Sequence, residues 1–81
     1  MKRIEKLTSN GAAYRLSGLI ECMDERKLSD AEVEAIKALK SDPVIIGGRP
    51  LGVYALATLD ITGAEKYKGQ DENVIDFIRA F

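Results

Sequence analysis

The sequence predicts an all-α domain of four helices, packed around one buried helix at residues 50–62. Apolar residues recur at helical spacing in residues 12–27 and 29–40, and again in residues 71–81. Residues 50–62 are apolar on nearly every side, and a helix without a polar face is buried all round. The chain has 81 residues, 46% hydrophobic and 31% charged, which fits one globular domain. We therefore place a single small helical domain at residues 1–81.

The first two segments differ in how clearly they predict a helix. Residues 1–8 are charged, with Ile4 and Leu7 on one side, so we expect one or two helical turns that dock by these side chains. Residues 12–27 follow a helical period with apolar positions at Ala12, Ala13, Leu16, Leu19, Ile20 and Met23. Gly18 lies inside this helix, and we expect it to let another helix approach closely.

The third helix has clear start and stop signals. Ser29 and Glu32 form a capping box, in which each side chain bonds the backbone amide of the other residue. We expect this helix to run to about Lys40 and to stop before Pro43, because the residue before a proline avoids helical angles. Residues 44–46 are β-branched, but the sequence offers no second strand, so we expect an extended, partly buried connection.

Local signals also bound the last two helices. Pro50 suits the first position of the buried helix, and Gly63 suits its end. Asp71 is the expected N-cap of the last helix. The apolar residues of that helix are Val74, Ile75, Phe77, Ile78 and Phe81. We expect it to leave one apolar face uncovered, and we predict that Phe77 and Phe81 contact a partner there or that the chain dimerises through this face.

The two halves of the chain repeat one another. Residues 12–25 placed over residues 52–65 align Tyr14 with Tyr54, Leu16 with Leu56, Leu19 with Leu59 and Glu25 with Glu65. After one extra loop residue, Asp30 aligns with Asp71, Val33 with Val74 and Ile36 with Phe77. Self-similarity at about forty residues, with two helices per unit, is typical of α-solenoids.

Within this repeat, residues 29–43 resemble the first helix and turn of a HEAT-like repeat, and residues 49–63 resemble its second helix. In that family an aspartate in the turn often holds an arginine early in the second helix, and Asp42 and Arg49 occupy comparable places. Residues 44–48 lengthen the turn, which departs from the family pattern. The resemblance implies a two-unit array of helix pairs and a role in protein interaction, and it carries over no catalytic residue.

Several kinds of catalytic and metal chemistry lack their usual residues. The chain has no histidine and one cysteine, so the commonest general base and the commonest zinc ligands are missing. No nucleotide-binding, zinc-protease or hydrolase motif occurs. Cys22 borders the apolar stripe, and we interpret it as a packing thiol. The following acidic residues are interpreted as solvated faces: Glu21, Asp24, Glu25, Asp30 and Glu34. We predict no enzymatic activity, no cofactor and no metal.

Charge and hydropathy argue against two further classes. The net charge is -1, the pI is about 5.4 and no long basic stripe occurs, which argues against a nucleic-acid binder. No apolar run approaches the roughly 18 residues of a membrane span. The single cysteine gives no sign of an oxidising compartment. We therefore expect a cytoplasmic protein that does not span a membrane.

The turn before the buried helix carries the candidate anion-binding residues Gly47, Gly48 and Arg49. Backbone amides at the start of a helix, together with a fixed positive charge, suit a small anion or a phosphorylated ligand. The alternative is a plain docking turn, in which Arg49 pairs with Asp42 or with a helix carboxylate.

Tyr67, between Lys66 and Lys68, is a second candidate for interaction. It is either a partner anchor with flanking cations or a loop residue packed back on the core. The leading functional hypothesis is a small intracellular helical module, an adaptor or regulator, that binds an unknown protein partner or itself. The alternative is a small-anion or phosphorylated-ligand binding protein that uses residues 47–50.

Overall fold

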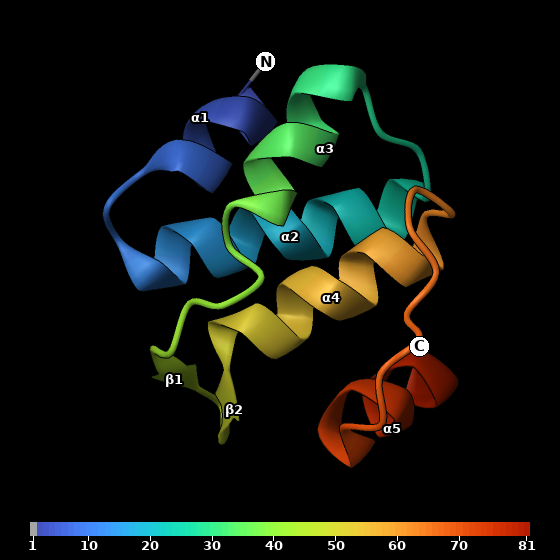
Figure 1. The fold of residues 1–81 in the computed structure, drawn as a ribbon. Coiled ribbons are helices and arrows are strands. Elements are labelled where there is room, and N and C mark those ends of the chain that lie inside the picture. The colour runs from blue at the N-terminus through green and yellow to red at the C-terminus, as the bar shows by residue number, and fades with distance from the viewer. Residues whose placement is uncertain (1) are drawn as a thin grey trace.

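The computed structural model describes residues 2–81, which form five helices and a two-stranded hairpin (Figure 1). In chain order these elements are α1 (Lys2–Thr8), α2 (Ala12–Glu25), α3 (Asp30–Lys37), β1 (Ile45–Ile46), β2 (Arg49–Pro50), α4 (Leu51–Ile61) and α5 (Glu72–Ala80). The prediction of a mostly helical chain is confirmed. The prediction of four helices was wrong, because the charged N-terminal segment forms a helix of its own.

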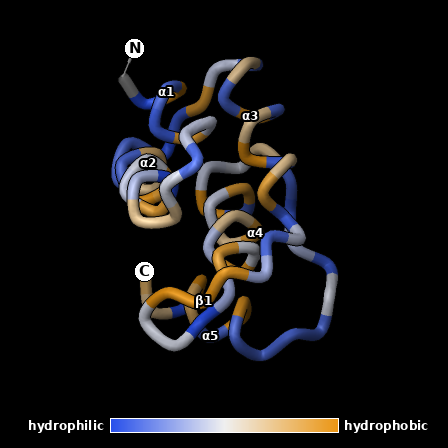
Figure 2. Tube along the Cα trace, turned by 90° about the vertical axis from the view of Figure 1, so that its left-hand side faces the viewer, coloured by the Kyte–Doolittle hydropathy of each residue, from blue (hydrophilic) through white to orange (hydrophobic). Residues whose placement is uncertain are grey.

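The central buried helix is α4. Figure 1 shows it between α2 and α3 on one side and α5 on the other, and it contacts all three. Its buried residues are Leu51, Gly52, Val53, Tyr54, Ala55, Ala57, Thr58 and Leu59. The helix begins at Leu51 rather than Pro50, because Pro50 keeps an extended backbone and pairs with Ile45 in the hairpin. Figure 2 shows the contrast between the hydrophobic α4 and the hydrophilic segment that follows it.

Helix α1 is fixed to α2 and α3 by one buried side chain and several ion pairs. Leu7 is fully buried in the core. A Cβ atom on Gly18 would lie 3.0 Å from the Lys6 Cβ, so the predicted close approach at this glycine is confirmed. Arg3 pairs with Glu25 and Glu32, and Lys6 pairs with Glu21. These contacts explain why a charged segment of seven residues is helical, since a free peptide of that length is not stable as a helix.

The expected connection at residues 44–46 is instead part of a small antiparallel hairpin. Ile46 pairs with Arg49 and Ile45 with Pro50. Gly47 and Gly48 have φ angles of 63° and 84°, and a two-residue hairpin loop of this kind needs positive φ at both positions. The all-α prediction is therefore incomplete at this point.

The segment after α3 shows a second difference from prediction. The capping box of Ser29 and Glu32 is confirmed, with bonds of 2.9 and 3.2 Å. The helix ends at Lys37 rather than about Lys40, because the following amides bond three residues back and tighten the chain into turns. Asp42 then pairs with Arg15 at 3.2 Å, not with Arg49, so the ion pair suggested by the family pattern does not form.

The helix packing is not the same in the two halves of the repeat. α4 packs on α5, whereas the main partners of α2 are α1 and α4. Ile20, predicted to lie on the buried stripe of α2, is 42% exposed. The apolar stripe of α2 is thus narrower than its sequence suggests, because α1 and α4 cover only part of it.

Candidate functional site

Three of the predicted site residues lie together on the surface beside α5. The Arg49 guanidinium carbon lies 5.3 Å from the centroid of the Phe77 ring. The Phe77 and Phe81 rings are stacked, with centroids 6.3 Å apart and an interplanar angle of 14°. Arg49 and the two phenylalanines were selected for different reasons, an anion site and an interaction face, and the fold places them in one group.

Arg26 completes this group, although no pattern in the sequence points to it. Its guanidinium carbon lies 5.4 Å from the centroid of the Phe81 ring. Arg26 ends α2 in the left-handed region, with φ 55°, and donates its backbone N–H to Cys22. The four residues, hereafter the Arg–Phe surface, therefore form a row of guanidinium, ring, ring and guanidinium from three different elements.

The core supports the Arg–Phe surface from below through Tyr54 of α4. The Tyr54 ring meets Phe77 edge to face, with centroids 5.2 Å apart and an angle of 84°. The Tyr54 hydroxyl donates a hydrogen bond of 2.8 Å to the Ile46 carbonyl and so ties the hairpin to the same helix. Tyr54 therefore supports Phe77 through its ring and is bonded to the hairpin through its hydroxyl, while Arg49 contacts the Phe77 ring directly.

The two guanidinium groups of this surface form no ion pair within the part of the chain that the structure describes. Among the residues that the structure describes, neither Arg26 nor Arg49 has a carboxylate within 4.0 Å. A hollow of about 210 Å³ is lined by Arg49, Phe77, Ala80 and Phe81. Phe81 is 42% exposed. The surface thus presents positive charge and aromatic area side by side, and within residues 2–81 no acidic side chain lines the hollow.

Gly47 and Gly48 do not lie at a helix N-terminus as predicted. They are exposed in the hairpin loop, and α4 begins only at Leu51. The amide of Leu51 donates to the Val44 carbonyl at 2.7 Å, and the amide of Gly52 donates to the Asp42 carbonyl at 3.0 Å. These first amides of α4 are therefore already bonded, and Arg49 is the one predicted anion-binding residue that contributes to the Arg–Phe surface.

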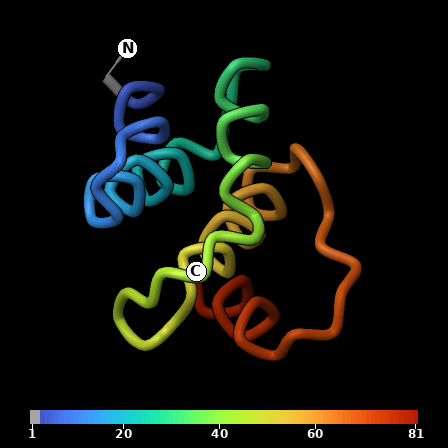
Figure 3. Tube along the Cα trace, turned by 60° about the vertical axis from the view of Figure 1, so that its left-hand side comes forward, coloured from blue at the N-terminus to red at the C-terminus, as the bar shows by residue number. Residues whose placement is uncertain are grey.

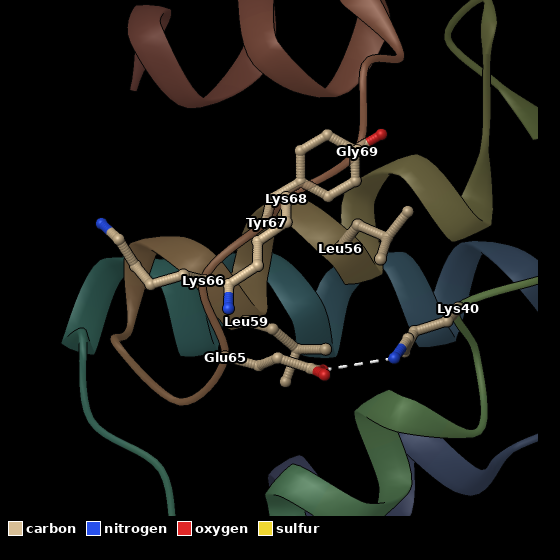
Figure 4. A pocket seen from close by; sticks show the side chains of 8 residues that line it. All are labelled: Lys40, Leu56, Leu59, Glu65, Lys66, Tyr67, Lys68 and Gly69. Carbon is tan, nitrogen blue, oxygen red and sulfur yellow. Dashed lines mark hydrogen bonds and ion pairs between the residues drawn. The ribbon is translucent and has the colours of Figure 1, made fainter.

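Tyr67 lies on the loop between α4 and α5 and is not part of the Arg–Phe surface. Its amide donates to Asp60 at 2.9 Å, and its hydroxyl accepts from the Asp71 amide at 3.1 Å. The side chain is half-buried and lines a separate pocket (Figure 4). Of the two interpretations of Tyr67, these contacts favour the packed loop residue.

The remaining predicted chemistry concerns metals, the thiol and membranes. Within residues 2–81 there is no group of three or more acidic or cysteine side chains arranged to hold a metal ion. Cys22 is fully buried, and this burial raises the pKa of its thiol to about 11. In the same described range, the helices are too short or too polar to cross a bilayer.

Comparison with protein-family profiles, curated proteins and solved structures finds no match for this chain.

Proposed function

We propose that this chain is a small helical interaction module, an adaptor or regulator without catalytic activity, that binds an acidic segment of a partner protein. The observation that carries the proposal is the Arg–Phe surface, where two guanidinium groups without carboxylate partners lie on two stacked rings. The HEAT-like arrangement stays part of this proposal, and its support is the sequence period of about forty residues. The cytoplasmic location also stays a prediction.

The composition of the Arg–Phe surface is that of an interaction centre. Aromatic residues and arginine are enriched at the centres of protein interfaces, where a few of them supply most of the binding energy. A guanidinium stacked on a ring keeps its N–H edge available for a carboxylate, and it is held in place before the partner arrives. Phe77 is fixed by Tyr54, so little side-chain freedom is lost on binding.

The charge of the surface favours an acidic partner over a second copy of this chain. In a two-fold symmetric dimer the same patch faces itself, so arginines of one copy would approach those of the other. Like charges brought together across an interface oppose association. A partner segment with carboxylates beside an apolar side chain instead complements both the guanidinium groups and the exposed part of Phe81.

Peptide titration followed by amide chemical shifts tests this proposal. The probe is acetyl-Glu-Glu-Phe-Glu-Glu-amide, and the matched peptide carries lysine in place of each glutamate. We expect the acidic peptide to shift the amides of Arg49, Phe77 and Phe81, and the basic peptide to leave them unchanged. Arg49→Ala should weaken binding by about ten- to a hundredfold, in the range of a hydrogen bond between charged groups. Arg79→Ala, on the exposed side of α5, is the control with the same charge change.

Three results would contradict the proposal. Equal binding of the acidic and basic peptides would show that charge does not select the partner. Equal loss of binding in Arg49→Ala and Arg79→Ala would place the contact elsewhere. A concentration-dependent dimer in sedimentation that Phe81→Ala abolishes would make a second copy the occupant.

A separate titration tests the small-anion alternative. Amide shifts with inorganic phosphate alone, confined to Gly47, Gly48 and Arg49, would favour it.

A further inference from the structure

A second hollow lies between α4 and the loop that joins it to α5. It has a volume of about 480 Å³ and is hereafter called the loop pocket (Figure 4). Figure 3 shows this loop bowing outward before it returns to α5. The volume falls within the range of about 300–1,000 Å³ that is usual for small-molecule sites. None of the four residues of the Arg–Phe surface lines it.

The loop pocket has a wall that is already ordered. The Glu65 amide donates to the Leu59 carbonyl at 3.1 Å, and the Tyr67 amide donates to the Asp60 carboxylate at 2.9 Å. The Tyr67 ring lies across Gly69 so closely that a Cβ atom there would be 2.4 Å from its hydroxyl oxygen. A ligand would therefore enter a site whose backbone is held by hydrogen bonds, and it would lose less free energy to loop ordering.

The apolar part of the loop pocket comes from α4. Leu56 and Leu59 face it, and Leu56 is only half-buried by the rest of the chain. The Tyr67 ring forms a further apolar wall. Covering such a surface with a short alkyl chain removes apolar area from water, which favours binding.

The charged part of the loop pocket leaves one ammonium group for a ligand. Lys40 is paired with Glu65 at 3.2 Å. Lys66 extends away from the other lining side chains in Figure 4. In Figure 4 the Lys68 side chain points toward the part of the view where Leu59 and Glu65 lie. Lys66 and Lys68 both lack an ion pair among the described residues, but Lys66 points away from the pocket, so one positive charge remains beside the apolar wall. One such charge matches a singly charged head group with an apolar body.

From these contacts we infer that the loop pocket binds a small carboxylate that carries a short alkyl or aryl body. The carboxylate lies against the Lys68 ammonium group, and the apolar body covers Leu56 and the Tyr67 ring. A single negative charge is favoured over a doubly charged phosphate because Lys40 is already neutralised by Glu65. The inference is independent of the interaction module proposed above, since the two sites share no residue.

Titration of the full chain with hexanoate, followed by amide chemical shifts, tests the inference. Acetate supplies the same head group without the alkyl chain, and 1-hexanol supplies the chain without the charge. We expect hexanoate to shift the amides of Leu56, Leu59 and residues 65–69 at concentrations where acetate and 1-hexanol have little effect. The amides of Phe77 and Phe81 should not move, which separates this site from the Arg–Phe surface.

Lysine variants make the test specific. Lys68→Ala should weaken hexanoate binding by about two- to fivefold, the range of one partly exposed ion pair. Lys37→Ala removes the same charge outside the loop pocket and should leave binding unchanged. Both lysines are exposed, so an unchanged amide spectrum without ligand will confirm that each variant folds. Equal shifts with 1-hexanol, equal shifts with acetate, or equal weakening in the two variants would overturn the inference.

Discussion

The two halves of this molecule use their positive charges differently. In residues 3–40, five cationic side chains pair with carboxylates: Arg3, Lys6, Arg15, Lys37 and Lys40. From residue 49 onward, no cation has a carboxylate within 4.0 Å among the described residues: Arg49, Lys66, Lys68 and Arg79. Three of these pairs, those of Arg3 and Lys6, join α1 to α2 and α3. The cations after residue 48 are left without such pairs among the described residues, and so are Arg26 and Lys27 at the end of α2.

The second half is held instead by backbone and aromatic contacts. The start of α4 lies directly against the chain at Lys40, with Gly52 at the contact. Tyr54 joins α4 to the hairpin and to Phe77. Charges that do not maintain the fold can be changed without unfolding it, and this is a property that binding surfaces need.

Gly52→Ala is expected to cause the largest loss of stability. A Cβ atom at this position would lie 2.4 Å from the Lys40 carbonyl oxygen, and neither backbone can move without displacing the first turn of α4. We expect the free energy of unfolding to fall by about 3 kcal/mol, at the upper end of overpacking effects. Urea denaturation followed by circular dichroism measures this change.

The matched variant is Gly18→Ala in the first half. Its new Cβ would lie 3.0 Å from the Lys6 Cβ and 3.1 Å from the Leu7 Cδ2. The end of the Leu7 side chain can shift, and a displacement of α1 by a few tenths of an ångström relieves the Lys6 contact, which is less severe than the 2.4 Å contact at Gly52. A gain of about 1 kcal/mol in helix propensity also offsets part of the clash. If Gly18→Ala destabilised the chain as much as Gly52→Ala, the contact between Gly52 and the Lys40 carbonyl would not distinguish the second half from the first.

Arg3→Met is expected to have the next largest effect. The Glu32 carboxylate is only 4% exposed, and Arg3 donates to it at 2.6 Å. Without the guanidinium, the buried carboxylate lacks a charged hydrogen-bond donor. We therefore expect the free energy of unfolding to fall by about 2 kcal/mol. Arg49→Met should change stability by less than about 1 kcal/mol, because only a cation–π contact is lost. Equal losses in the two variants, measured by urea denaturation, would remove the contrast between the halves.

The same ion pair predicts how stability depends on pH. Burial alone would raise the pKa of Glu32, but the hydrogen bonds from the Ser29 amide and the Arg3 guanidinium lower it below its ordinary value of 4.5. A carboxyl group whose pKa is lower in the folded state stabilises the fold above the unfolded value, and this contribution is lost as pH falls through the folded value. Below about pH 4.5 we therefore expect stability to fall less steeply in Glu32→Gln than in the wild type. Glu34→Gln, on the exposed side of α3, should keep the wild-type slope.

Local signals explain what could be predicted from the sequence. The capping box at Ser29, the cap at Asp71 and the glycine that ends α4 depend on neighbours within a few residues, and each has the expected role. The burial of α4 follows from its composition alone, since it has no polar face to expose. Such features require no knowledge of how distant segments meet.

The missed features depend on distant contacts or on very short elements. The hairpin has strands of two residues, and one of them contains Pro50, which cannot donate to the ladder. The family pattern suggested Arg49 as the partner of Asp42, but the fold brings Arg15 of α2 to it, a contact between residues 27 positions apart. Arg26 reaches Phe81 because the end of α2 lies beside the end of α5, and no local pattern indicates this.

Tyr54→Phe tests the aromatic support of the second half with a smaller change. It removes the hydroxyl that donates to the Ile46 carbonyl and keeps the ring contact with Phe77. We expect the free energy of unfolding to fall by about 1 kcal/mol and the hairpin amides to exchange faster. Binding of the acidic peptide should be retained. Tyr14→Phe, on the exposed surface of α2, is the control and should change neither property. Lost peptide binding in Tyr54→Phe would show that the hairpin, and not the ring stack alone, positions Arg49.

Arg26→Gly is expected to have the smallest effect on stability, and it tests whether a cation of the first half without an ion pair among the described residues serves binding rather than the fold. Glycine adopts the positive φ of this position without the strain of about 1 kcal/mol that an L side chain carries there. The lost cation–π contact with Phe81, about 0.5–1 kcal/mol, opposes this gain, so the net change should be within about 0.5 kcal/mol. Acidic-peptide affinity should nevertheless fall, whereas Lys27→Gly, one residue further on, should leave it unchanged. A stable variant with normal affinity would show that Arg26 serves only to end α2, and the Arg–Phe surface would then reduce to Arg49 and the two rings.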